Sequence, residues 1–258
     1  MARLHPGAIW ALVKEARIAA EDVRPLLVTG ALAEQLEQEL ARGAKPGAVR
    51  STGRVEDAAV LVRILAGAPT EEDVAAARAA DRADVPVVAV QTSGEEGTEL
   101  PYVLATDVVT CPPGAGFPVD EILARVVGRL GEHGTALAAR IPALRDPLCD
   151  ELIESFSRKN GLLGGAVFVP GADFPVLTLN QLRLVLRIAS AYGVEVDQSR
   201  LPEVAGTVAA GFGFRAVARQ LLGVLPVAGW VVKGAVAYSG TRAVGEAARL
   251  YFAAVADA

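Results

Sequence analysis

Residues 58–65 read AAVLVRIL and decide the fold class of the first half of the chain. All but one of these residues are apolar, which is typical of a strand buried on both faces of a parallel sheet. Similar apolar runs occupy residues 24–30 (RPLLVTG), 85–91 (VPVVAVQ) and 102–110 (YVLATDVVT). Because strand and helix patterns alternate along this part of the chain, the sequence predicts a doubly wound, mostly parallel α/β sheet.

The helices of this predicted domain carry recognisable end signals. Residues 31–43 (ALAEQLEQELARG) close on a glycine, Thr70 precedes three acidic residues as an N-cap would, and residues 118–130 start at a proline. Ahead of the first strand, residues 8–20 place their apolar side chains on one stripe of a helix. We expect this amino-terminal helix to dock on its own domain, with attachment to a membrane surface as the alternative.

The turn after the first strand is where a phosphate-binding loop would stand. Such a loop reads G-x-x-x-x-G-K-[S/T], because its backbone amides surround the phosphates, the lysine meets their charge and the hydroxyl binds magnesium. Counting from Gly30, the last three places hold Gln35, Leu36 and Glu37. A carboxylate and a leucine there would repel and desolvate a triphosphate, so we predict an ordinary strand-to-helix turn.

Two other places support the same prediction. The strand at residues 85–91 runs into QTSG at 91–94, and the residues at 56–59 read EDAA. In the order of its elements, the segment 24–135 resembles the Era-like bacterial GTPases, which carry N-K-x-D at the first place to read guanine and D-x-x-G at the second to hold magnesium. The resemblance implies descent from a GTPase, and the altered motifs predict that GTP is neither bound nor hydrolysed.

A glycine-containing loop keeps one enzymatic alternative open. Residues 112–117 (PPGAGF) join the carboxyl end of a strand to a helix, which is where ligands gather in open α/β sheets. A divergent NTPase could use Gly114 and Gly116, together with Gly30, as a phosphate loop, with Arg50 or Lys45 on the phosphate. A plain turn before a proline-started helix is the competing interpretation.

The second half of the chain predicts a separate helical domain. An amphipathic helix ends near residue 160 and a glycine-rich linker follows at 161–171, so we divide the chain into residues 1–145 and 146–258. Helices are predicted at 178–192, 202–225 and 227–254. Small residues recur every four positions in the last two, which predicts a glycine-rich helical hairpin hinged at Pro226.

The wording of this region resembles the family known as domain of unknown function 697. The residues that carry the resemblance are PVLTLNQ at 175–181, AYG at 191–193, GFGFR at 211–215, Pro226 with GW at 229–230, and TR at 241–242 with Gly245. The resemblance spans roughly residues 148–254 and implies a helical region that is often membrane-associated and has no assigned reaction.

Cations interrupt the apolar hairpin. Arg215, Arg219 and Lys233 must reach carboxylates, helix-end carbonyls, water or lipid phosphate, because an unpaired buried charge is very costly. We therefore expect either structural pairing or contact with anionic lipid or a partner. Asn180 and Gln181 are expected to make local hydrogen bonds near a helix start. Residues 221–240 are long enough to span a membrane, although a peripheral hairpin fits the flanking arginines better.

Composition limits the remaining functions. Residues 1–145 hold 15 Lys and Arg against 20 Asp and Glu, whereas 174–258 hold 8 against 5, so the charge changes from −5 to +3. Two cysteines and two histidines in no ligand spacing suggest neither a metal nor a catalytic triad, and we expect no cofactor and no nucleic-acid partner. The sequence predicts a cytoplasmic, non-catalytic scaffold that oligomerises, binds a protein partner or sits on the inner face of the membrane.

Overall fold

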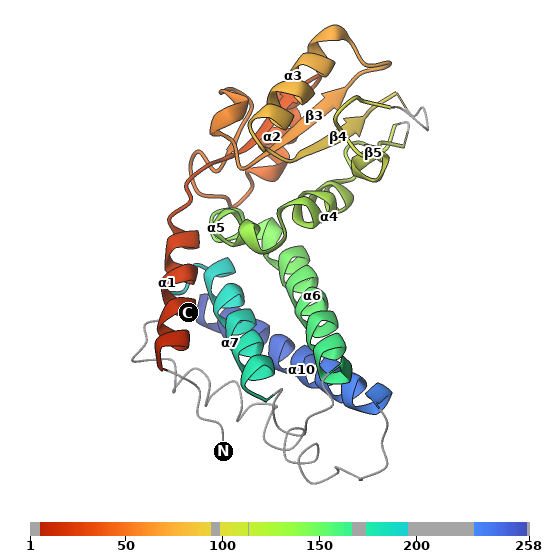
Figure 1. Cartoon of the computed structure of the whole chain (residues 1–258). Coiled ribbons are helices and arrows are strands. Elements are labelled where there is room, and N and C mark those ends of the chain that lie inside the picture. The colour runs from red at the N-terminus through yellow and green to blue at the C-terminus, as the bar shows by residue number, and fades with distance from the viewer. Residues whose placement is uncertain (1–5, 94–98, 113, 167–173, 196–229, 257–258) are drawn as a thin grey trace. The chain divides into compact units, whose positions relative to one another are not determined.

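The computed structural model describes residues 6–93, 99–112, 114–166, 174–195 and 230–256 (Figure 1). The chain divides into two compact units. Residues 22–148 form the α/β unit, and residues 1–21 with 149–258 form the helical unit.

The α/β unit is built on a five-stranded sheet in which every paired strand is parallel. The strand order is β2-β1-β3-β4-β5, one of the two common orders of doubly wound domains. The predicted parallel α/β sheet is thereby confirmed. The strands are β1 (Leu26–Gly30), β2 (Val49–Arg50), β3 (Val60–Leu65), β4 (Val87–Gln91) and β5 (Val108–Thr110).

Helices cover both faces of this sheet. The connections from β1 to β2 and from β3 to β4 run in opposite directions along the sheet, so right-handed crossovers place α2 (Ala33–Leu40) and α3 (Glu71–Arg82) on opposite faces. α4 (Val119–Leu130) follows β5, and the short α5 (Thr135–Ala138) follows α4. All six residues of β3 are buried, as its apolar sequence predicts.

Thr70 caps α3 as the sequence predicts. Its hydroxyl accepts a hydrogen bond from the amide of Asp73, and the Asp73 carboxylate accepts one from the amide of Thr70. This reciprocal pair is a capping box, which satisfies two amides that the helix itself leaves without partners.

The helical unit contains four described helices: α1 (Pro6–Ala20), α6 (Arg145–Ala166), α7 (Phe174–Ala191) and α10 (Trp230–Ala256). The sequence assigned the amino-terminal helix to the α/β domain, whereas the structure packs it beside α7 (Figure 1). An ion-pair cluster explains this placement, because the carboxylate of Glu15 meets the guanidinium groups of both Arg183 and Arg187.

The prediction of a linker at 161–171 is wrong for its first six residues, because α6 continues to Ala166. Glycines serve helix packing here rather than flexibility. A Cβ added at Gly164 would lie 2.7 Å from the Cβ of Ala237, and one added at Gly234 would lie 2.8 Å from the carbonyl oxygen of Gly161. α6 and α10 therefore cross at a distance that only glycine permits. The predicted helix at 202–225 and the hinge at Pro226 fall outside the described residues.

Candidate functional site

The turn after β1 is the first candidate site, and the amide of its first residue, Ala31, is already engaged. Gly30 adopts φ +97°, and an added Cβ would lie 2.2 Å from the carbonyl oxygen of Ile64, so the close approach of β3 accounts for this glycine. That same carbonyl accepts a hydrogen bond from the amide of Ala31 at 3.2 Å. α2 starts at Ala33, which leaves only two residues between strand and helix.

The three positions that a phosphate loop would fill with Gly-Lys-Ser/Thr lie inside α2. The amides of Gln35 and Leu36 donate to the carbonyl of Leu32, and the Leu36 side chain is fully buried. Gln35 points to solvent and Glu37 is half-buried. The buried leucine anchors α2 on the sheet, so the chain uses this turn for packing.

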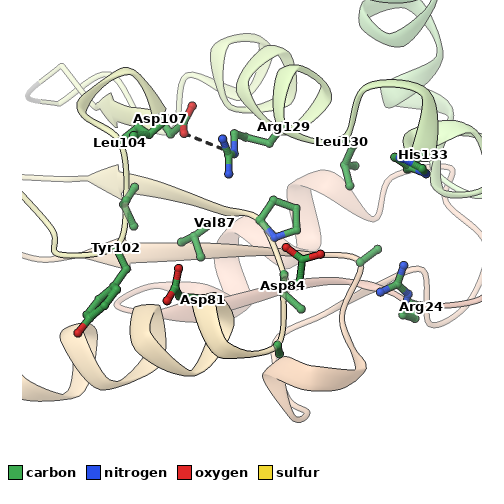
Figure 2. Close-up of a pocket in the computed structure, with 15 residues that line it drawn as sticks. Arg24, Asp81, Asp84, Val87, Tyr102, Leu104, Asp107, Arg129, Leu130 and His133 are labelled. Atoms are coloured by element: carbon green, nitrogen blue, oxygen red, sulfur yellow. Dashed lines mark ion pairs between the residues drawn. The ribbon is translucent and has the colours of Figure 1, made fainter.

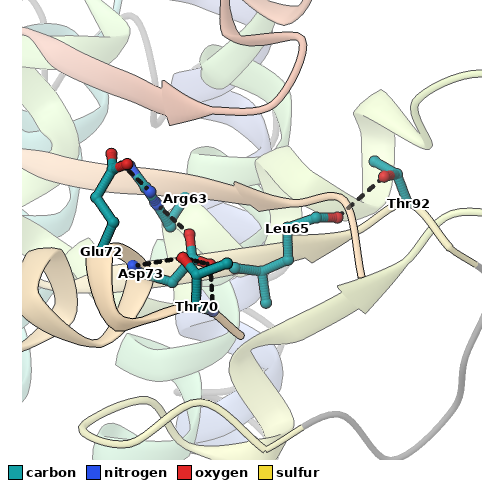
Figure 3. A network of polar contacts seen from close by, with 6 residues as sticks. All are labelled: Arg63, Leu65, Thr70, Glu72, Asp73 and Thr92. Carbon is teal, nitrogen blue, oxygen red and sulfur yellow. Dashed lines mark hydrogen bonds and ion pairs between the residues drawn. The ribbon is translucent and has the colours of Figure 1, made fainter. Parts of the chain in front are cut away.

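At the end of β4, the residues that stand where guanine would be read are bonded to the neighbouring strand connection. Gln91 is fully buried, and its Nε2 donates to the carbonyl of Gly67 at 3.1 Å. Thr92 donates both its amide and its hydroxyl to the carbonyl of Leu65, at 3.0 and 2.9 Å. Figure 3 shows the Thr92 hydroxyl bond beside the start of α3.

A buried charge cluster occupies the amino end of α3, and the sequence analysis missed it (Figure 3). Arg63 is the one charged residue of β3, and its side chain is 7% exposed. Its Nε donates to Asp73 at 2.7 Å and its Nη2 donates to the exposed Glu72 at 3.1 Å. The arginine in an otherwise apolar strand was the available signal, because a buried guanidinium requires a carboxylate partner.

The ionisation of Asp73 follows from these contacts. Burial alone would raise the pKa of Asp73, but hydrogen bonds from Thr70 and Arg63 outweigh it and hold the pKa below its usual value. The first turn of α3 thus carries the carboxylates of Glu71, Glu72 and Asp73. A helix amino terminus is the usual place for a phosphate, and here carboxylates of the chain itself occupy it.

The loop after β5 contains the other two candidate glycines. Gly114 and Gly116 are exposed with φ +76° each, and no atom lies within 4 Å of a Cβ added at either. The following helix, α4, carries Asp120 and Glu121 in its first turn, which disfavours a phosphate there too. Burial and the charge of Glu121 raise the pKa of the neighbouring Cys111 thiol.

The sheet does not bring together the candidate glycines and cations of a divergent NTPase. Arg50 belongs to β2 and Lys45 precedes it, whereas Gly114 and Gly116 follow β5. β2 and β5 are the two edges of the sheet, four strand spacings apart, which amounts to about 19 Å. A phosphate on the loop after β5 would therefore lie far from both cations.

A cavity of about 480 Å³ opens at the opposite end of the sheet (Figure 2). Its walls include the carboxyl-terminal ends of α3 and α4 and the start of β4. Ligands of doubly wound sheets gather at the carboxyl ends of the strands, and the carboxyl ends of helices disfavour anions. The charged or polar groups that line it are Arg24, Asp81, Asp84, Tyr102, Asp107, Arg129 and His133.

Most cations of this cavity are already paired. Arg129 lies 3.5 Å from Asp107, and Arg24 holds Asp22 through a bond of 2.7 Å that lowers the pKa of that carboxyl. Asp84 and Tyr102 have positive φ angles of 54° and 71°, which the sequence did not indicate. The cavity has mixed charge and does not offer a triphosphate a cationic cradle.

In the helical unit, Asn180 and Gln181 make tertiary rather than local hydrogen bonds, so that expectation was wrong. Asn180 donates to the Oδ1 of the fully buried Asn160 at 2.9 Å, and Gln181 donates to the hydroxyl of Thr241 at 3.3 Å. Asn160 also donates to Thr241 at 2.8 Å. This polar node, Asn160, Asn180, Gln181 and Thr241, joins α6, α7 and α10.

The candidate cations of the hairpin are only partly covered by the structure. Lys233 is exposed on α10, while Arg215 and Arg219 lie outside the described residues. Arg242 reaches the carboxylate of Glu154 on α6 at 3.2 Å, across the helix pair. Hydrogen bonds from Tyr238 and then from Arg158 lower the pKa of Glu154.

Two further features are absent from the described residues. In that part of the chain, no helix is both long and apolar enough to cross a membrane. The same residues contain no group of three or more His, Cys, Asp or Glu side chains arranged to hold a metal ion.

No protein-family model, no curated protein and no solved structure matches this chain. The resemblances to Era-like GTPases and to domain of unknown function 697 therefore stay predictions.

Proposed function

We propose that this chain is a non-catalytic scaffold whose α/β unit carries no nucleotide and whose helical unit makes the contacts with other molecules. The observation that carries the proposal is the turn after β1. Its amides at Ala31, Gln35 and Leu36 donate to carbonyls of the protein, and the helix begins two residues after the strand. A triphosphate would have to displace these bonds, because phosphate loops hold their ligand through free backbone amides.

The charges at the carboxyl edge of the sheet support the same proposal. α3 and α4 both present carboxylates in their first turns, and Arg63, the buried cation of β3, is committed to Asp73 and Glu72. At 4 Å, two like unit charges repel by about 4 kcal/mol at a protein surface. An anionic ligand over the first turn of either helix would meet that repulsion.

The architecture of the helical unit supports an interaction role. Glycine contacts hold α6 against α10, and the polar node fixes the register of three helices. Such close packing around a hydrogen-bonded polar node gives a rigid surface, which limits the entropy lost on binding a partner.

Isothermal titration of the full chain with GTP and magnesium, and separately with ATP and magnesium, tests the proposal. We expect no stoichiometric binding and no rise in the melting temperature at millimolar nucleotide, because a ligand that binds the folded state must stabilise it. Stoichiometric binding with micromolar affinity would refute the proposal.

A variant sharpens this test. Gly116→Glu places a carboxylate on the open loop after β5, where no neighbouring atom would clash with a Cβ. If that loop held phosphate, this substitution would abolish any magnesium-dependent hydrolysis, and Gly43→Glu, an equally open position with φ +72°, would not. We expect no hydrolysis in the parent chain or in either variant.

A further inference from the structure

The outer face of α1 combines large apolar side chains with cations. The exposed positions of this helix recur at spacings of three and four, so they lie on one side of it. Trp10 is 55% exposed and Ile18 is 58% exposed. The exposed residues on this side are Gly7, Trp10, Ala11, Lys14, Arg17 and Ile18, with Glu21 just after the helix, and Ala20 in its last turn is exposed as well.

The inner face of α1 is already engaged. Leu12 and Val13 are part-buried on the side that packs beside α7, and Glu15 is paired with Arg183 and Arg187 of that helix. The acidic residue in the middle of α1 therefore reaches toward α7, and its charge is neutralised there. The outer face keeps the two cations Lys14 and Arg17.

These side chains have the chemistry of a membrane interface. Tryptophan is enriched at the headgroup level of bilayers, and lysine and arginine beside it reach lipid phosphates. The Nζ of Lys14 lies 5.2 Å from the centroid of the Trp10 ring, so cation and indole form one continuous surface. Ile18 stands two helical turns further along the same side.

The charges also argue against a second copy of the chain as the occupant. A two-fold interface places the same patch on both partners, so Lys14 and Arg17 of one copy would face those of the other. Like charges across an interface are unfavourable, whereas an anionic lipid surface is complementary to them.

We propose that the outer face of α1 is a peripheral docking surface for an anionic membrane, with Trp10 and Ile18 entering the headgroup region and Lys14 and Arg17 meeting lipid phosphates. The proposal deepens the proposed function in one respect, since it rests on the helical unit making the contacts. It does not depend on the state of the nucleotide motifs.

Tryptophan emission gives a local readout. The chain has two tryptophans, so the Trp230→Phe variant leaves Trp10 as the sole emitter. Full-length protein is mixed with vesicles of phosphatidylcholine, or of phosphatidylcholine with phosphatidylglycerol. We expect a blue shift of the Trp10 emission and co-sedimentation only with the anionic vesicles, and we expect both to weaken with added salt.

Two double variants and a matched control complete the design. Trp10→Ser with Ile18→Ser, and Lys14→Glu with Arg17→Glu, should each weaken sedimentation with anionic vesicles by about tenfold or more. Leu104→Ser removes a leucine that is 59% exposed in the α/β unit and should leave sedimentation unchanged. Circular dichroism and melting temperature establish that each variant is folded.

Three results would overturn the proposal. The first is undiminished sedimentation of both folded α1 variants, which would place lipid contact elsewhere in the chain. The second is equal binding to neutral vesicles. The third is a concentration-dependent dimer that the α1 variants abolish while vesicles have no effect, which would assign the face to a second copy. Binding of GTP in the titration above would refute the non-catalytic scaffold and leave the vesicle result standing, so the two failures are distinguishable.

Discussion

Removing Asp73 from the buried Arg63–Asp73 pair should destabilise the α/β unit much more than removing Arg63. Both side chains are less than a tenth exposed, and the Nε of Arg63 donates to Asp73 at 2.7 Å. If Asp73 is replaced by alanine, the buried guanidinium keeps only Glu72, whose carboxylate is 83% exposed. Breaking a buried pair in this way costs about 3 to 5 kcal/mol, because one charge is left uncompensated. The same substitution also removes the capping box, worth roughly 1 kcal/mol.

The reverse substitution should cost much less. In Arg63→Met, Asp73 keeps hydrogen bonds from the Thr70 amide at 2.8 Å and the Thr70 hydroxyl at 2.7 Å, and it remains at a helix amino terminus. Methionine fills the space of the arginine stem with apolar atoms. We therefore expect a loss of about 1 to 2 kcal/mol, in the range of one charged hydrogen bond.

Hydrogen exchange measures both losses in the full chain. Peptides that cover β3 and β4 report the opening free energy of the α/β unit without interference from the helical unit. We predict that Asp73→Ala accelerates their exchange at least about thirtyfold more than Arg63→Met, since the two losses differ by at least about 2 kcal/mol and 1.4 kcal/mol is a factor of ten. Equal acceleration, or a larger effect of Arg63→Met, would refute the reasoning that the unpaired arginine costs more free energy than the unpaired aspartate.

Three further predictions concern stability. The folded pKa of Asp73 is below its unfolded value of about 3.9, so its contribution to the free energy of unfolding is complete above that value and is lost as the pH falls through the folded pKa. The unfolding free energy of the parent chain should therefore fall more steeply below pH 4 than that of Asp73→Asn, and parallel curves would contradict this. Gly30→Ala should lower the unfolding free energy by at least about 2 kcal/mol in urea titrations, because its Cβ would lie 2.2 Å from the carbonyl oxygen of Ile64. Gly43→Ala, with nothing within 4 Å of its Cβ, should cost about 1 kcal/mol from its positive φ alone, and similar losses in the two variants would be inconsistent with the close approach of β3. Asn160→Leu should cost about 2 to 3 kcal/mol, because it removes the hydrogen bonds that Asn160 makes with Asn180 and Thr241 in the polar node. Arg158→Ala, a solvent-facing change on the same helix, should stay within about 0.5 kcal/mol, and the two melting temperatures provide the comparison.

The α/β unit could be predicted because its signals are local. The apolar composition of residues 58–65 is typical of a strand buried on both faces. Thr70 indicates a helix start, because its own side chain caps the helix. The mismatch of residues 35 to 37 with a phosphate-loop motif could also be predicted, because the charge and size of these residues are properties of the sequence itself.

The helical unit was harder because its decisive contacts are between distant residues. The glycines at 161 and 164 have the same local signal whether they loosen a linker or admit a neighbouring helix, and only the position of α10 decides between these uses. Asn160 and Thr241 are separated by 81 residues, so no local pattern relates them. The amino-terminal stripe shows that α1 docks somewhere, but not on which unit.

The cluster of Glu15 with Arg183 and Arg187 has a consequence for how this protein is made. Arg183 follows Glu15 by 168 residues, and the whole α/β unit is encoded between the two. At about 5 to 20 residues per second, roughly ten to thirty seconds separate the emergence of α1 from the ribosome and that of its partner helix. During that interval the α/β unit can fold, while the apolar stripe and the Glu15 carboxylate of α1 remain uncovered until α7 emerges. α1 is thus synthesised before the α/β unit but can pair with α7 only after that unit has emerged.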